Sequence, residues 1–204
     1  AYALSLEEIQ EVEPYFAGRY TPSPTPAPTL TAVPTSSPAP TASPTVQPTS
    51  PPSMTRLLVC DFESSDLCGF TNGDYAWTRD AYGTPSSNTG PRGDHTTGAG
   101  YYMHVEATGA SGHPPYTLTS PTFSECVGEV RFAYHMYGSA MGTLALEQTT
   151  NGVDWTTLWT KSGDQGDSWQ HAIANASSYV LQVRFAGTAG TSYTSDMAID
   201  DVRL

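Results

Sequence analysis

The sequence predicts an all-β protein, an antiparallel β-sandwich that follows a disordered linker rich in Pro, Thr and Ser. Short segments of alternating apolar and polar residues fill the chain from Arg56 onward, with Gly, Pro and Ser between them. No long segment shows the 3.6-residue period of a helix. The Asn151-Gly152 pair between two of the alternating segments is typical of a two-residue β-hairpin turn.

The strands are predicted from the faces on which side chains alternate. Residues 101–106 place Tyr101, Met103 and Val105 on one face and three polar-tipped side chains on the other, which predicts a half-buried strand. The same alternation predicts strands at 58–63, 130–137, 144–146, 155–160, 169–173, 179–185 and 197–204. Residues 56–204 therefore form the predicted folded domain, and they are enough to bury one sizeable core.

Residues 21–55 are predicted to be a disordered stalk. Eleven of the 17 prolines lie in this stretch, interleaved with Thr, Ser and Ala, and it contains no charged residue. Proline removes backbone donors and favours extended polyproline II, so such a segment forms no packed core. At about 3.1 Å per residue it would span on the order of 100 Å, and its composition suits O-glycosylation.

Residues 1–20 are predicted to be the C-terminal remnant of an upstream domain. Ser5 and Glu8 form a capping signature for a short acidic helix, which cannot form a core alone. The run Ala-Leu-Ser-Leu-Glu-Glu-Ile at 3–9 resembles the closing segment of laminin-G-like, concanavalin-type domains, over about residues 1–12. A frayed terminal helix is the alternative.

Composition excludes some classes of partner. The net charge of -12, with Lys161 as the sole lysine, argues against binding to nucleic acid, whose phosphates need basic contacts. No apolar run approaches the roughly 20 residues that cross a bilayer, so we expect no membrane insertion. The chain opens with neither a secretory signal nor Met, and we expect it to be a fragment of a longer protein.

The three cysteines predict one local disulfide. Cys60 and Cys68 are close enough in the chain to pair, and the odd Cys126 suggests a partner outside the fragment. Zinc is the competing interpretation, but no further Cys or clustered His completes a set of four ligands.

Nine ordered blocks carry a family resemblance. They are Cys60-Asp-Phe-Glu63, Leu67-Cys68-Gly-Phe70, Trp77-Thr-Arg79, Asn88-Thr-Gly-Pro-Arg-Gly-Asp-His-Thr96, Gly100-Tyr-Tyr-Met-His-Val-Glu106, Ser120-Pro121, Phe132-Ala-Tyr-His-Met-Tyr-Gly138, Ser162-Gly-Asp-Gln-Gly166 with Trp169, and Ile199-Asp-Asp-Val202. Over about residues 57–204 they resemble the MAM family, named after meprin, neuropilin-type receptors and receptor tyrosine phosphatase mu. The resemblance implies a jelly-roll sandwich in an extracellular or cell-surface ectodomain.

The cysteines depart from the family pattern. The family usually pairs four cysteines first to second and third to fourth, and Cys60 with Cys68 fits the first pair. Cys126 lacks the fourth cysteine, which the resemblance places just past Leu204. The fragment is therefore expected to end slightly short of the domain.

Five carboxylates form a metal-site hypothesis. Calcium takes six to eight oxygen ligands from several segments, and the first and last strands of a jelly roll often lie close together. Some family members bind calcium or sodium in this region, and the matching positions here are Asp61, Glu63, Asp94, Asp200 and Asp201. Asp200 shares the alternation of Val202 and Leu204, so it is predicted to point inward, where a carboxylate needs a partner or a metal. Capping and solvated turns are the alternative, and such an ion would be structural.

The remaining motifs favour binding over catalysis. Asn175-Ala-Ser177 is an N-glycosylation sequon. The histidines are scattered over separate segments, and no sequence of the HExxH, GxSxG or phosphate-loop type is present, so no catalytic residue is assigned. We therefore expect a non-catalytic extracellular adhesion module that binds a protein, a second copy included. A carbohydrate-binding accessory domain, or an accessory domain of an enzyme whose catalytic part lies elsewhere, is the alternative.

Overall fold

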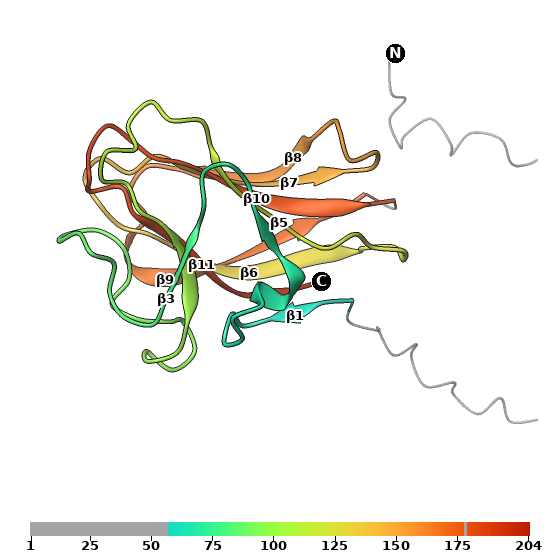
Figure 1. Ribbon diagram of the computed structural model, residues 1–204, viewed down its shortest axis with the longest axis horizontal. Helices are drawn as coiled ribbons and strands as arrows, with labels where there is room; N and C mark the ends of the chain where they lie inside the picture. The colour runs from blue at the N-terminus through green and yellow to red at the C-terminus, as the bar shows by residue number, and fades with distance from the viewer. Residues whose placement is uncertain (1–56, 178) are drawn as a thin grey trace, which may run out of the picture. The chain divides into compact units, whose positions relative to one another are not determined.

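The computed structural model describes residues 57–177 and 179–204, and these form two antiparallel sheets packed face to face (Figure 1). The predicted all-β sandwich is confirmed. The interpretations of residues 1–20 and 21–55 lie outside the described residues.

The first sheet has the order β3-β4-β11-β6-β9, and β1 pairs with β11. Its strands are β1 (Val59–Cys60), β3 (Thr78–Asp80), β4 (Tyr102–Val105), β6 (Glu129–Met136), β9 (Gly166–Asn175) and β11 (Met197–Arg203). A short 3-10 helix, η1 (Leu67–Gly69), follows β1.

The second sheet has the order β2-β5-β10-β7-β8 and forms the upper layer in Figure 1. Its strands are β2 (Thr71–Asn72), β5 (Tyr116–Thr119), β7 (Thr143–Thr149), β8 (Thr156–Ser162) and β10 (Gln182–Thr188). The first and last strands of the described domain meet, because β1 pairs with the end of β11.

The core lies between the inner faces of the sheets. Phe132 on β6 contacts Phe185 on β10 and Trp159 on β8 at ring-centroid distances of 5.0 and 5.1 Å. Ile199 and Val202 of β11 are fully buried in the same cluster. Each such side chain stabilises the fold by roughly 1.5–3 kcal/mol when it is fully buried. Because alternation places these side chains on one face of each strand, the two apolar faces pack against each other.

The β4 strand differs from its prediction, because all four of its residues are buried rather than alternate ones. The long loop between β3 and β4, residues 81–101, covers the outer face of the first sheet. The Tyr102 hydroxyl donates to the carbonyl of Tyr82, and the Trp169 indole on β9 donates to the carbonyl of Gly93 at 3.1 Å. The loop thus buries part of the outer face of the first sheet, where polar side chains such as His104 are enclosed with apolar ones.

The predicted hairpin at Asn151-Gly152 is present with a longer loop. β7 pairs with β8, but residues 150–155 separate them. The Asn151 side chain accepts hydrogen bonds from the amides of Val153 and Asp154, which closes the chain around an Asx turn. Within residues 57–177 and 179–204, no helix has the length and hydropathy that a bilayer crossing needs.

Candidate functional site

A β-bulge in β11 decides where Asp200 points. Between the pairs Asp200–Ala133 and Arg203–Arg131, β11 advances three residues while β6 advances two. Asp201 takes a left-handed φ of 51° at this point. Ile199 and Val202 therefore both face the core, and Asp200 faces the opposite side. The prediction that Asp200 is buried holds at 2% exposure, but its assignment to the face of Val202 is wrong.

Asp200 is buried beneath the loop between β3 and β4. Its carboxylate accepts hydrogen bonds from the amides of His95, at 3.0 Å, and Asp201, at 2.7 Å. Burial raises the pKa of Asp200 to about 7, and the nearby charges of Asp201 and Asp94 raise it further against those hydrogen bonds. A buried carboxyl with this pKa is stabilised by a bound proton or a bound cation.

Asp94 organises the loop itself. Its carboxylate accepts hydrogen bonds from the amides of Thr96, Thr97 and Gly100, and from the Thr97 hydroxyl at 2.9 Å. Burial alone would raise the pKa of Asp94, but the donors on Thr97 and Gly100 hold it below its ordinary value. Asp94 therefore stays ionised next to Asp200.

Glu63 reaches the same loop from the segment that follows β1. Its Oε1 accepts a hydrogen bond from the amide of Tyr101 at 2.8 Å. A Cβ placed on Gly100 would lie 2.1 Å from Glu63 Oε1 and 3.0 Å from Asp94 Oδ2. Gly100 therefore lies between two carboxylates, in a space that any larger residue would fill.

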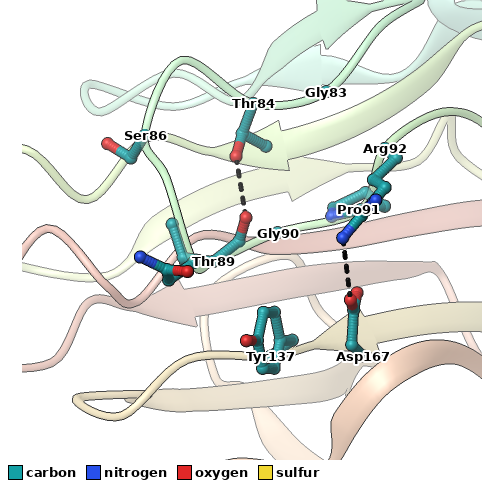
Figure 2. Close-up of a pocket in the computed structure, with 10 residues that line it drawn as sticks. Gly83, Thr84, Ser86, Thr89, Gly90, Pro91, Arg92, Tyr137 and Asp167 are labelled. Carbon is teal, nitrogen blue, oxygen red and sulfur yellow. Dashed lines mark hydrogen bonds and ion pairs between the residues drawn. The ribbon is translucent and has the colours of Figure 1, made fainter.

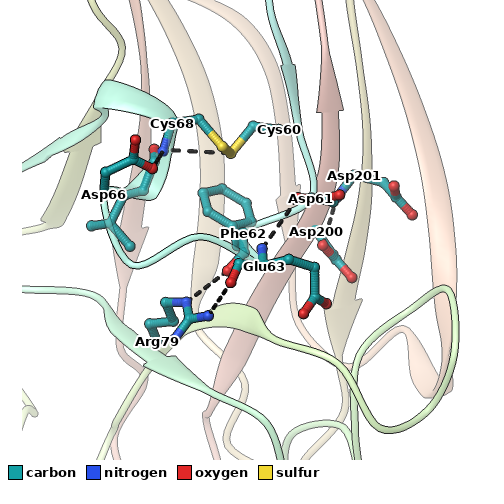
Figure 3. Close-up of a disulfide and its surroundings, with 10 residues drawn as sticks. Cys60, Asp61, Phe62, Glu63, Asp66, Cys68, Arg79, Asp200 and Asp201 are labelled. Atoms are coloured by element: carbon teal, nitrogen blue, oxygen red, sulfur yellow. Dashed lines mark hydrogen bonds between the residues drawn. A yellow bond between two sulfur atoms is a disulfide. The ribbon is translucent and has the colours of Figure 1, made fainter.

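The Cys60–Cys68 disulfide holds the segment that carries Glu63 (Figure 3). The Arg79 guanidinium braces this segment by donating to the carbonyls of Phe62 and Glu63, each at 2.6 Å. Phe62 is buried in the core with a left-handed φ of 56°, so its side chain and its carbonyl are both fixed. Cys126 is exposed and forms no disulfide within the described residues.

Asp61 and Asp201 form different contacts from Glu63, Asp94 and Asp200. Asp61 is exposed and accepts a hydrogen bond from the amide of Glu63 at 3.2 Å. The Asp201 side chain points away from Asp200 in Figure 3 and contacts His95 Nδ1 at 2.7 Å. Burial acts to raise the pKa of Asp201, but the Thr96 hydroxyl and His95 lower it overall.

Glu63, Asp94 and Asp200 will be called the acid centre. In residues 57–177 and 179–204, no three His, Cys, Asp or Glu side chains converge as a ready-made metal site. The donor set nevertheless fits a hard cation, since three carboxylates border one loop and Gly100 leaves room beside two of them. Carbonyls and water would have to complete the coordination.

A trough lies along the same loop, and Asp94 of the acid centre belongs to its lining. One cavity of about 210 Å³ is lined by Thr84, Thr89, Tyr137 and their neighbours (Figure 2). A second cavity, of about 290 Å³, is lined by His135 and Trp169. Pro91, Arg92 and Asp167 line both cavities, so the two form one trough.

An ion pair lies at the point where the two cavities join. Arg92 Nη2 lies 3.8 Å from Asp167 Oδ2, with side-chain exposures of 93% and 39%. Such an exposed pair adds little to stability. No local sequence pattern assigns Tyr137, which follows β6, or Asp167, near the start of β9, to a site. Both reach the trough only because strand ends distant in the chain meet the same loop.

The glycosylation candidate, Asn175, is the last residue of β9 and is exposed. An attached glycan would point into solvent there. Its presence stays a prediction.

Comparison with known proteins identifies the family. The sequence model of one protein family, the MAM domain, meprin/A5/mu, matches residues 60–204. The chain belongs to the MAM family. MAM domain-containing protein 2 of Mus musculus is 38% identical over 155 residues, which cover 71% of this chain and 22% of that protein. Neuropilin-1a of Danio rerio is 34% identical over 158 residues, which cover 72% of this chain and 17% of that protein.

The MAM relatives also include a MAM domain-containing glycosylphosphatidylinositol anchor protein 1 of Gallus gallus, 37% identical over 166 residues, 72% of this chain and 17% of that protein. This MAM domain is accordingly an extracellular or cell-surface module. The chain spans only about a fifth of the length of these relatives.

Among solved structures, the K2 cleaved adhesin domain of Lys-gingipain superposes with a TM-score of 0.55 at 15% identity, covering 72% of this chain and 97% of that chain. The K1 domain from Porphyromonas gingivalis W83 gives 0.53 at 17% identity, with 72% and 95% covered. At this identity the likeness concerns the fold alone.

Proposed function

We propose that this MAM domain is a non-catalytic recognition module of a larger extracellular or cell-surface protein, and that it binds a protein partner through the trough. The exposed Arg92–Asp167 pair is the observation that carries the proposal. It places one charge of each sign at the surface, in a protein whose net charge is -12. Charges at the rim of an interface steer association and select partners.

A second copy of the domain is the partner we favour. The guanidinium of Arg92 on one copy could pair with Asp167 of the other, as a two-fold interface requires. The pair within one copy is long, at 3.8 Å, so exchanging it between copies loses little.

The acid centre supports this function by shaping the loop. We propose that Glu63, Asp94 and Asp200 hold a structural calcium or sodium ion. Residues 90–92 of the trough belong to the same loop as Asp94 and Gly100. Because Asp94 also lines the trough, an ion bound to it would fix this part of the surface.

Glycan binding is the second candidate. Tyr137 lines one cavity and Trp169 the other, with hydroxyl and amide groups of Thr84 and Asn88 beside them. Aromatic rings combined with hydrogen-bonding side chains suit a sugar.

Sedimentation velocity of the full 204-residue chain, with calcium and with chelator, tests the proposal. We expect a concentration-dependent dimer that weakens with chelator and is lost in Arg92→Glu. The double variant Arg92→Glu/Asp167→Arg should recover it, because the pair is reversed. Arg131→Glu, an exposed arginine outside the trough, is the matched control.

A monomer under every condition would rule out self-association. If the monomer binds glycans on an array, and Tyr137→Ala and Trp169→Ala lose that binding, carbohydrate recognition replaces self-association as the function.

A further inference from the structure

A second pair of carboxylates lies on the outer face of the first sheet, away from the acid centre. Met197 of β11 pairs with Val105 of β4. Asp196 precedes Met197 and Glu106 follows Val105, so the two carboxylates lie across from each other just beyond the last paired residues of β11 and β4. Like charges in that position destabilise a sheet.

Both carboxylates have an oxygen without a partner. Asp196 is 0% exposed; its Oδ1 accepts from the amide of Ala107 at 2.8 Å, and its Oδ2 is buried without a hydrogen bond. Glu106 Oε1 accepts from the amide of Thr108 at 2.9 Å, while Oε2 is likewise buried and unpaired. Unpaired buried carboxylate oxygens are strongly unfavourable, so they indicate something that the protein atoms alone do not supply.

Protein cations do not neutralise the pair. In the described part of the chain, no lysine or arginine forms an ion pair with Asp196 or Glu106. His104 is close enough for Glu106 to act on its pKa, but burial lowers that pKa, so its imidazole is neutral near pH 7. Among the described residues, then, no side-chain cation balances the two carboxylates, which leaves a bound cation or a shared proton.

Three hydroxyls surround the two carboxylates. Ser86 Oγ donates to Glu106 Oε1 at 3.3 Å, and Thr89 Oγ1 accepts from the amide of Asp196 at 2.8 Å. The Thr84 hydroxyl lies near Asp196 as well. These hydroxyl-bearing residues also line the 210 Å³ cavity in Figure 2.

We propose that Asp196 and Glu106 hold a calcium ion between Asp196 Oδ2 and Glu106 Oε2, with Thr84, Ser86 and water as neutral ligands. Two carboxylates match the charge of a divalent cation, and oxygen donors alone suit a hard one. Burial raises the pKa of Asp196 to about 6, with Glu106 contributing. A bound cation would stabilise the ionised form of both carboxylates. The site has no residue in common with the acid centre, and its neutral ligands Thr84 and Ser86 also line the trough.

Sequence alone hides this site. Glu106 and Asp196 each read as one charge beside an apolar strand. The sequence shows only that Glu106 directly follows, and Asp196 directly precedes, a strand whose alternate residues are apolar.

The test counts calcium ions bound by the full 204-residue chain, stripped with EDTA, using isothermal titration calorimetry. Asp196→Asn keeps the acceptor for Ala107 and removes the charge, so we expect it to lower the number of bound calcium ions by one. The same loss is expected in a Glu63→Gln background, which separates this site from the acid centre. Asp154→Asn, an exposed carboxylate in the β7–β8 loop, should change nothing.

Two further variants keep the test decisive if Asp196→Asn does not fold. Glu106→Gln should also lose one bound calcium ion, and Ser86→Ala should weaken one class of binding roughly tenfold or more. An unchanged number of bound ions in Asp196→Asn overturns the proposal. So does a shared proton, which would appear as Asp196→Asn raising the melting temperature equally with and without calcium.

Discussion

The guanidinium of Arg79 lies 3.3 Å from the ring centroid of Tyr101, at the start of β4. The same guanidinium donates to the carbonyls of Phe62 and Glu63. One side chain thus joins the segment after β1 to the loop that carries Asp94 and Gly100. The acid centre is assembled across this contact.

Arg79→Lys should destabilise the fold by about 2 kcal/mol, because an ammonium cannot make both hydrogen bonds and the same ring contact. Urea denaturation measures the change. Arg131→Lys, whose arginine is exposed and pairs only with Glu129, should stay within about 0.5 kcal/mol of the parent. Equal effects at the two positions would contradict this role of Arg79.

Removing the disulfide with Cys60→Ala/Cys68→Ala should lower the free energy of unfolding by about 2–3 kcal/mol, as expected for closing a short loop. Thermal and urea denaturation report the loss. Cys126→Ser is the control, since Cys126 is exposed and its replacement should leave stability unchanged. A double variant as stable as the parent would show that packing of Phe62 holds the segment without the bond.

Gly100→Ala should remove the response to calcium more than it destabilises the fold. The new methyl would displace the flexible end of Glu63, which is closest at 2.1 Å, and press on Asp94. The parent should melt at a higher temperature with calcium than with chelator, and the variant should show a much smaller difference. Gly128→Ala is a matched control, because nothing lies within 4 Å of its added Cβ.

Acidification should destabilise the domain through His135. Its side chain is 2% exposed, and burial lowers its pKa below 6.5 although Asp167, 3.4 Å away, acts to raise it. In the unfolded chain His135 has its ordinary pKa. Just below pH 6.5 the unfolded chain therefore binds a proton at His135 more readily than the folded protein does. This contribution to stability is present above pH 6.5 and declines as the pH falls below it.

Urea denaturation at about pH 7.5 and about pH 5.5 checks this sign. The raised pKa values of Asp200 and Asp196 act in the opposite direction, because the folded protein binds protons there that the unfolded chain does not. The contribution of His135 is therefore the difference between two proteins: on acidification, His135→Gln should lose less stability, or gain more, than the parent. His171→Gln, an exposed histidine on β9, should behave like the parent. An identical pH dependence in parent and His135→Gln would remove His135 as the cause.

The sequence by itself determined the strands, the sandwich and the family. Alternation is a local property, and burying the side chains of one face brings two sheets together. The strands predicted at 130–137 and 179–185 accordingly carry Phe132 and Phe185, which meet in the core. The ordered blocks from Cys60 to Val202 then identified the family.

Only the tertiary structure decided which carboxylates meet. The bulge that turns Asp200 away from Val202 arises from the pairing of β11 with β6, and no single strand encodes its partner's register. The opposition of Asp196 and Glu106 depends in the same way on the pairing of β11 with β4. The burial of both faces of β4 and the trough at Asp167 depend on a long loop that folds back over the sheet. The pattern along a strand specifies which of its faces is buried, because it depends on neighbouring residues alone. The carboxylate sites need contacts between segments that are distant in the chain.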